Sequence, residues 1–135
     1  MLREIIHNLW IGDYFDAINN YGEFDVVVSI TQPEAIPKFS SNSKPLHFAI
    51  CVYDDAFPDG VFSTGTQILH NYLNEDKKVL AHCTVGVSRS VALVIAYLNK
   101  SVSFGEAYAL VEFTGPVIIQ PDLLVSLKKY CGEEG

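Results

Sequence analysis

Hydrophobic and polar positions alternate along this chain in a way that predicts strands and helices in turn. Short apolar runs indicate strands, and we expect them over residues 5–11, 24–30, 46–52 and 79–82. Apolar residues at helical spacing and residues that favour a helix start indicate the helices. We expect these over residues 13–18, 61–73, 88–100, 103–113 and 121–130.

Strands that alternate with helices are typical of an α/β fold. We expect a single domain over residues 1–135, with a mostly parallel central sheet and helices on both of its faces. Residues 31–45 are rich in Pro and Ser, so we expect a loop there with at most a short helical turn. Ligands bind such sheets beyond the carboxyl ends of the strands. The end of the predicted strand 79–82 is therefore a candidate site.

The segment that follows this strand carries the sequence's most informative motif. Residues 82–90 read His-Cys-Thr-Val-Gly-Val-Ser-Arg-Ser, between one apolar run and another. Backbone N–H groups that converge at a helix N-terminus bind anions, and Gly86 allows a sharp turn. We expect a phosphate to be bound by residues Thr84, Val85, Gly86, Val87, Ser88 and Arg89.

The side chains of this loop predict nucleophilic chemistry. Free thiols have a pKa of about 8.5, and helix N-termini and cations lower it, so we expect Cys83 to be a thiolate that attacks phosphorus. Arg89 can hold two phosphate oxygens. Ser90 or Ser88 can donate a hydrogen bond to the sulfur or to loop carbonyls, and His82 is expected to face away from the pocket and support the loop.

The motif His-Cys-x5-Arg-Ser resembles the signature of the cysteine-dependent protein phosphatases. Its form Gly-Val-Ser-Arg-Ser is most similar to the dual-specificity phosphatases, and residues 8–12, 24–30 and 116–130 also resemble that family. The resemblance implies hydrolysis of phosphotyrosine and phosphoserine or phosphothreonine in phosphoproteins or phosphopeptides, through a phosphocysteine intermediate, with no metal and no cofactor. It also implies a shallow pocket, because no phosphotyrosine-recognition segment precedes the domain.

The reaction needs a carboxylic acid to protonate the leaving group and later to activate water. Asp54 and Asp55 follow the predicted strand 46–52, so their loop should open on the same sheet edge as Cys83. In the family that this chain resembles, the acid often lies four residues before a proline, as Asp54 lies before Pro58. Asp54 is therefore favoured, and Asp55 remains the alternative or a supporting residue.

The chain departs from the family's pattern within the loop and before the late proline. Thr84 and Val85 stand where the family often has an alanine or a Lys-Met pair, and we expect their side chains to face outward or into packing. The usual arginine before the late proline is absent, because residues 113–116 read Phe-Thr-Gly-Pro. Gln120 could position a water molecule or cap the next helix.

The composition excludes some partners of this chain and predicts its cellular compartment. The net charge of −7 opposes nucleic-acid binding, and the longest apolar run, residues 91–98, is too short to span a membrane. Three cysteines without zinc spacing suit a reducing compartment, which predicts a cytoplasmic protein. Cys51 could trap Cys83 as a disulfide, or it could be a buried strand residue.

Other functions remain open at this level. One is a non-catalytic module that binds phosphoproteins. Others are a phosphatase for phosphoinositides or RNA 5′ phosphates, and a sulfur-transfer or arsenate-reducing enzyme that would need a second thiol such as Cys51.

Overall fold

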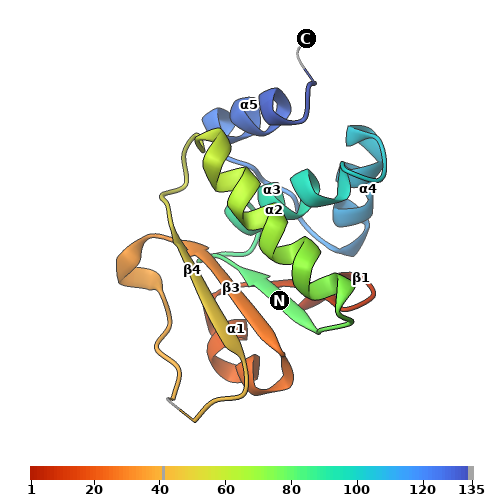
Figure 1. The fold of residues 1–135 in the computed structure, drawn as a ribbon. Helices are drawn as coiled ribbons and strands as arrows, with labels where there is room; N and C mark the ends of the chain where they lie inside the picture. The colour runs from red at the N-terminus through yellow and green to blue at the C-terminus, as the bar shows by residue number, and fades with distance from the viewer. Residues whose placement is uncertain (41, 134–135) are drawn as a thin grey trace.

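The computed structural model describes residues 1–40 and 42–133, in which five strands form one sheet (Figure 1). The strand order is β1-β2-β5-β3-β4. The strands are β1 (Arg3–Ile6), β2 (Leu9–Gly12), β3 (Val26–Thr31), β4 (Leu46–Cys51) and β5 (Val79–His82). β2, β5, β3 and β4 pair in parallel, while β1 runs antiparallel to β2. The predicted mostly parallel sheet is confirmed.

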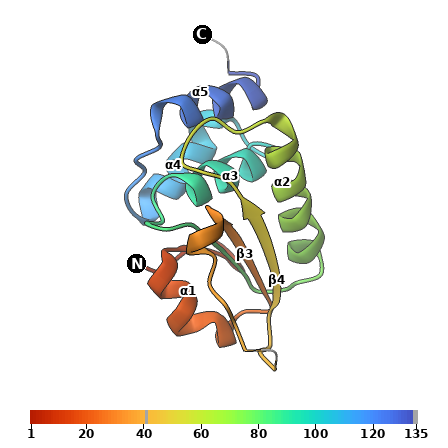
Figure 2. The ribbon, with the colours of Figure 1, turned by 90° about the vertical axis from the view of Figure 1, so that its left-hand side faces the viewer.

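Helices cover both faces of this sheet, as predicted. They are α1 (Tyr14–Asn20), α2 (Asp59–Asn74), α3 (Arg89–Leu98), α4 (Phe104–Thr114) and α5 (Pro121–Tyr130). Figure 2 shows α1 on one side of β3 and β4 and α2 on the other. No helix in the described part of the chain is long and apolar enough to cross a membrane.

The single strand predicted over residues 5–11 is wrong. The chain reverses after Ile6, and β1 and β2 form an antiparallel pair with Glu4 opposite Trp10. Asn8 takes a left-handed backbone conformation (φ 70°), which asparagine tolerates better than most residues. Its side-chain amide donates to Asp76 Oδ1 at 3.0 Å. Apolar residues lie on both sides of the two polar turn residues, His7 and Asn8, which is why the sequence predicts one strand over the whole stretch.

The predicted helix boundaries differ from the structure by a few residues. α2 begins at Asp59 rather than at residue 61, with Pro58 as its N-cap, and the Asp59 carboxylate lies in the first turn. A carboxylate there is stabilised by the helix dipole. Gln120 caps α5, because its Oε1 accepts the N–H of Leu123 at 2.9 Å. Of the two roles open for Gln120, the structure shows capping.

The sheet separates two apolar clusters. Successive side chains of a strand point to opposite faces, and Val26, Val28 and Ile30 of β3 lie in the larger cluster with α2, α3, α4 and α5. Val27 lies in the smaller cluster on the α1 face, together with Ala17. α3 crosses the middle of the larger cluster, so the segment before it is held between β5 and a buried helix.

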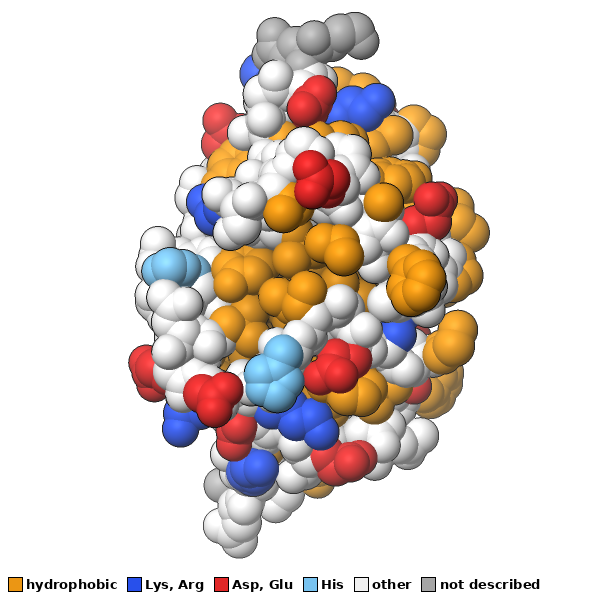
Figure 3. All heavy atoms as spheres, turned by 90° about the vertical axis from the view of Figure 1, so that its right-hand side faces the viewer, with side chains coloured by type: hydrophobic (Ala, Val, Ile, Leu, Met, Phe, Trp, Pro, Cys, Tyr) orange, Lys and Arg blue, Asp and Glu red, His pale blue; other side chains and the backbone are white. Residues whose placement is uncertain are grey.

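Some apolar surface remains outside these clusters. Figure 3 shows hydrophobic side chains gathered in the middle of one face. α4 leaves Leu110 and Phe113 exposed. Exposed apolar side chains are common on folded proteins, and we assign these no function.

Candidate active site

Four parallel strands end at one edge of the sheet, and the candidate residues follow these ends. In the strand register, His82 lies opposite both Gly12 of β2 and Ser29 of β3, and Thr31 lies opposite Cys51 of β4. The loops after β2, β3, β4 and β5 therefore open together. Residues 84–89, the predicted phosphate loop, and the loop that carries Asp54 are therefore neighbours, as the sequence predicts.

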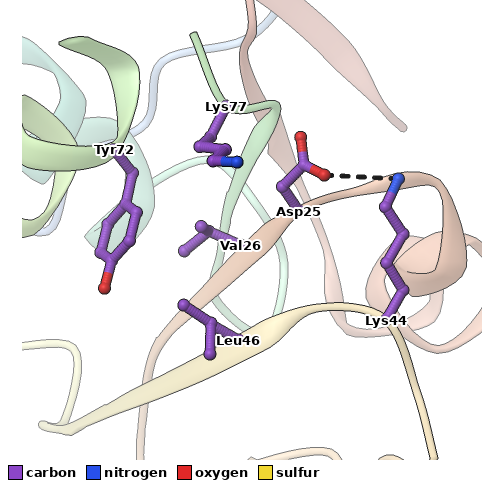
Figure 4. A pocket seen from close by; sticks show the side chains of 6 residues that line it. All are labelled: Asp25, Val26, Lys44, Leu46, Tyr72 and Lys77. Carbon is purple, nitrogen blue, oxygen red and sulfur yellow. Dashed lines mark ion pairs between the residues drawn. The ribbon is translucent and has the colours of Figure 1, made fainter. Parts of the chain in front are cut away.

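The pocket drawn in Figure 4 lies elsewhere. It is lined by Asp25 and Val26 at the start of β3 and by Leu46 at the start of β4. Asp25 there pairs with Lys44 at 3.4 Å. The pocket is therefore at the amino ends of the strands, away from Cys83.

Cys83 begins the loop between β5 and α3, and its sulfur lies beside two polar groups. The residue is 2% exposed. Its Sγ accepts the N–H of Gly86 at 3.3 Å and lies 3.2 Å from Ser90 Oγ. The backbone N–H of Gly86 and the hydroxyl of Ser90 are therefore the polar groups beside this sulfur. Of the two serines considered, Ser90 contacts the sulfur.

Gly86 is required by the shape of this loop. Its φ is +81°, and a Cβ at this position would lie 2.9 Å from Gly12 O. A left-handed conformation is costly for residues with a Cβ, and the close backbone of β2 leaves no space. The predicted sharp turn is confirmed.

Arg89 is buried at the start of α3, and other side chains hold its guanidinium in place. Nη1 donates to Val52 O at 3.1 Å and to Gln32 Oε1, and Nη2 donates to Thr84 Oγ1 at 3.1 Å. Nε is buried and has no partner among the described residues. Buried donors are rarely left unpaired in proteins, and Nε–H is the donor of this guanidinium that the described residues leave free.

Thr84 corrects one expectation, because its side chain faces neither solvent nor apolar packing. Thr31 Oγ1 donates to Gln32 Oε1 at 2.9 Å and lies 2.9 Å from Thr84 Oγ1. The Thr31 hydrogen is used toward Gln32, so Thr84 donates to Thr31. Arg89, Thr84, Thr31 and Gln32 thus form a closed ring of hydrogen bonds. Val85 is exposed, as expected.

The two aspartates of the neighbouring loop differ in what they touch. Ser88 Oγ donates to Asp54 Oδ1 at 2.6 Å and accepts the backbone N–H of Gln120 at 3.0 Å. Asp55 Oδ1 accepts the N–H of Ala56 within its own loop, at 2.7 Å. The geometry therefore joins Asp54 to the phosphate loop and favours it over Asp55.

Comparison with known proteins identifies the family of this chain. Residues 9–131 match the family model of the dual specificity phosphatase catalytic domain. The chain belongs to this family. The family predicted from the motif is therefore confirmed, and the α/β fold class predicted from the alternation of strands and helices agrees with the structure.

Two curated relatives are similar to parts of this phosphatase domain. Human dual specificity protein phosphatase 9 is 26% identical over 116 residues, which cover 81% of this chain and 30% of that protein. A dual specificity protein phosphatase of vaccinia virus is 30% identical over 104 residues, 73% of this chain and 58% of the relative. The chain thus matches 58% or less of the length of these two relatives.

A solved structure supports the fold. The human tyrosine phosphatase-like serine/threonine/tyrosine-interacting protein has a TM-score of 0.82 and 21% sequence identity, covering 96% of this chain and 94% of its own.

His82 supports the loop of this phosphatase domain from the α1 face. Its Nδ1 lies 3.2 Å from Cys83 O. A carbonyl can only accept, so Nδ1 carries the hydrogen and Nε2 accepts from Ser29 Oγ, at 2.6 Å. Ser29 Oγ in turn accepts from His47 Nε2 at 2.7 Å. Burial lowers the pKa of His82 to about 4, so the ring is neutral at pH 7.

Cys51 matches neither interpretation drawn from the sequence. It is exposed rather than buried, and β3 lies between its strand and β5. Two strand spacings separate backbones by about 9.6 Å, whereas disulfide-bonded residues have Cα atoms within about 7 Å. A disulfide between Cys51 and Cys83 would require β3 to move.

Sequence reasoning missed five residues that support the phosphatase site. They are Arg3, Ser29, Thr31, Gln32 and His47. Thr31 and Gln32 could have been noticed as polar residues at the carboxyl end of a predicted strand. The others act through contacts between segments far apart in the chain, which no local pattern reveals.

Proposed function

We propose that this chain is a protein phosphatase that hydrolyses phosphotyrosine and phosphoserine or phosphothreonine through a phosphocysteine intermediate. The observation that carries this proposal is the meeting of three groups at one loop. The Cys83 sulfur lies among donors, Arg89 has a buried N–H without a partner, and Asp54 is bonded to Ser88.

In the first step the loop amides and Arg89 bind the phosphate oxygens, and Cys83 Sγ attacks phosphorus. The S–P bond forms as the bond from phosphorus to the leaving oxygen breaks, and the electron pair leaves on that oxygen. Asp54 gives this oxygen a proton. Ser88 already donates to Oδ1 of Asp54, so Oδ2 is the oxygen that would carry the proton.

In the second step a water molecule attacks the phosphorus of the phosphocysteine. The Asp54 carboxylate takes a proton from this water, the S–P bond breaks, and inorganic phosphate leaves. The sulfur departs as a thiolate that accepts hydrogen bonds from Gly86 N and Ser90 Oγ. Both steps balance without a metal, a cofactor or a redox partner.

The rim of the site supports phosphoprotein substrates. Tyr53, Val85 and Ile118 expose 63%, 66% and 68% of their surface. Ile118 lies beside the loop, since its backbone N–H donates to Val87 O at 2.9 Å. These exposed apolar side chains offer contact to a phosphotyrosine ring or to the apolar residues of a phosphopeptide. The thiolate chemistry needs a reducing environment, in keeping with a cytoplasmic setting.

The central test replaces the nucleophile. Cys83→Ser should abolish release of p-nitrophenol from p-nitrophenyl phosphate and of phosphate from phosphopeptides, while phosphopeptide binding persists. Cys51→Ser, at an exposed position outside the loop, is the matched control and should retain wild-type turnover. Wild-type turnover by reduced Cys83→Ser would refute the proposal.

A second test separates the two aspartates. Asp54→Asn should lower kcat for phenyl phosphate by about 10²-fold or more, because general acid catalysis contributes about 10²–10⁴-fold. Its effect on p-nitrophenyl phosphate should be smaller, since that leaving group needs less protonation. Asp55→Asn is the matched control. If Asp55→Asn shows the larger, leaving-group-dependent loss, Asp55 is the acid.

A phosphate-binding module without turnover is the second candidate. The name of the human structural neighbour, a phosphatase-like interacting protein, is what favours it. Reduced protein that binds phosphopeptide but releases no phosphate would support this function. Phosphoinositides and RNA 5′ phosphates in the same assay would show whether the site acts on esters other than those of proteins.

A further inference from the structure

Arg3 is a buried cation beside the phosphate loop. It lies in β1 and is 6% exposed. Its guanidinium has no carboxylate partner among residues 1–40 and 42–133. A buried charge is costly unless it is paired or well hydrogen-bonded. A negatively charged group nearby would therefore stabilise the buried Arg3 guanidinium.

The hydrogen bonds of Arg3 lead to the nucleophile. Its Nη2 donates to Gly86 O at 2.9 Å and to Pro116 O at 2.8 Å. The N–H of the same Gly86 donates to Cys83 Sγ at 3.3 Å. A single loop residue thus joins the Arg3 guanidinium to the Cys83 sulfur.

Gly115 leaves the space that the guanidinium fills. A Cβ on Gly115 would lie 2.7 Å from Arg3 Nη1. Nη1 is itself buried without a hydrogen-bond partner in the described part of the chain. Gly115 belongs to residues 113–116, the segment in which the family's usual arginine is absent. In this chain the cation beside the loop is instead Arg3 of β1.

The charge of Arg3 acts on Cys83. Burial lowers the pKa of the Arg3 guanidinium, and the negative charge of Cys83 acts in the opposite direction. Attraction between two charges in a buried site is stronger than in water. The Cys83 thiolate is therefore the counter-charge that the buried arginine otherwise lacks.

We propose that Arg3 is a positioning residue for the phosphatase reaction: it holds Gly86 in place and stabilises the Cys83 thiolate through space. This inference rests on the proposed function, because it takes Cys83 as the nucleophile. Arg3 acts through the loop and its charge, whereas Arg89 is the residue proposed to bind the phosphate itself.

Other charged or titratable groups also face the loop, and they stay unchanged when Arg3 is replaced. They are Arg89 at the start of α3, His82 on β5, Asp13 and Asp16 at the start of α1, and Asp54 across Ser88. A difference between the wild type and an Arg3 variant therefore isolates the contribution of Arg3.

The test measures the thiolate directly. Alkylation of Cys83 by iodoacetamide is followed from pH 4 to pH 9 by mass spectrometry of its peptide, which separates it from Cys51 and Cys131. In Arg3→Met the pH of half-maximal rate should rise by about one unit, the size of effect of a nearby opposite charge. The acidic limb of kcat/KM should move with it. Arg3→Lys keeps the charge and should stay close to the wild-type profile.

A second variant displaces Arg3 without changing it. Gly115→Ala should push the guanidinium away and move the alkylation profile in the same direction as Arg3→Met. Gly105→Ala is the matched control, since a Cβ there meets nothing within 4 Å. Sites that act through each other are not additive, so Gly115→Ala should add no further shift to Arg3→Met.

Two results would overturn the inference. One is a wild-type alkylation profile in both Arg3→Met and Gly115→Ala. The other is a Gly115→Ala shift that persists in full in the Arg3→Met background. Failure of the proposed function is distinct, because it is seen as a lack of turnover by the wild-type protein, and alkylation requires no turnover.

Discussion

Acidification should destabilise this protein through His82. Burial lowers the pKa of this side chain from 6.5 to about 4 in the folded state. Between these values the unfolded chain binds a proton that the folded protein does not, so stability is full above pH 6.5 and falls as the pH drops toward 4. Each unit corresponds to about 1.36 kcal/mol, so the loss approaches about 3 kcal/mol. That is a large share of the roughly 5–15 kcal/mol that stabilises most domains.

The assay is urea unfolding at several values between pH 4 and pH 7, for the wild type and for His82→Gln. The variant loses the hydrogen bonds to Ser29 and Cys83 O and should be less stable at every pH. The informative quantity is the slope of stability against pH, since the carboxylates contribute equally to both proteins. The wild type should lose about 3 kcal/mol more than the variant over this range.

His70→Gln is the matched control for this experiment, because His70 lies exposed on α2. It should keep the wild-type slope. Equal slopes for the wild type and His82→Gln would refute the reasoning, since they would mean that the folded protein does not hold His82 neutral.

Three further substitutions test the packing and the loop. Gly65→Ala should destabilise the protein by about 1–3 kcal/mol in urea unfolding, because its Cβ would collide with the Leu93 side chain between α2 and α3. Ser88→Ala should lower kcat several-fold for phenyl phosphate and less for p-nitrophenyl phosphate, because Asp54 loses its 2.6 Å hydrogen bond; equal losses for both esters would contradict this. Gly86→Ala should lower both the unfolding free energy and kcat/KM, because its φ of +81° and the nearby Gly12 O leave no place for a methyl group; unchanged kcat/KM would contradict the tight loop.

The sequence by itself was enough for the parts of this protein that depend on local pattern. The order of strands and helices follows from hydrophobic spacing, because a half-buried element must repeat its apolar residues at its own period. The position of Cys83, Gly86 and Arg89 around a helix start follows from one nine-residue motif. The turn between β1 and β2 escaped this reasoning, since apolar residues continue on both sides of it.

Only the tertiary structure decided how distant segments meet at this loop. Asp54 and Asp55 are neighbours with the same chemistry, and the 2.6 Å bond from Ser88 separates them. The disulfide considered for Cys51 depends on strand order, which places β3 between the two cysteines.

The residues that support the loop from other strands show most clearly what the tertiary structure decided. Arg3 and Gly86 lie far apart in the sequence and 2.9 Å apart in the fold. Ser29 bonds to His82 and His47 bonds to Ser29, so these hydrogen bonds link three strands. Local periodicity reports which face of an element is buried, and it carries no information on which other element covers that face. The motif therefore predicted the chemistry, and the packing of β1, β3, β4 and β5 decided which side chains surround the loop.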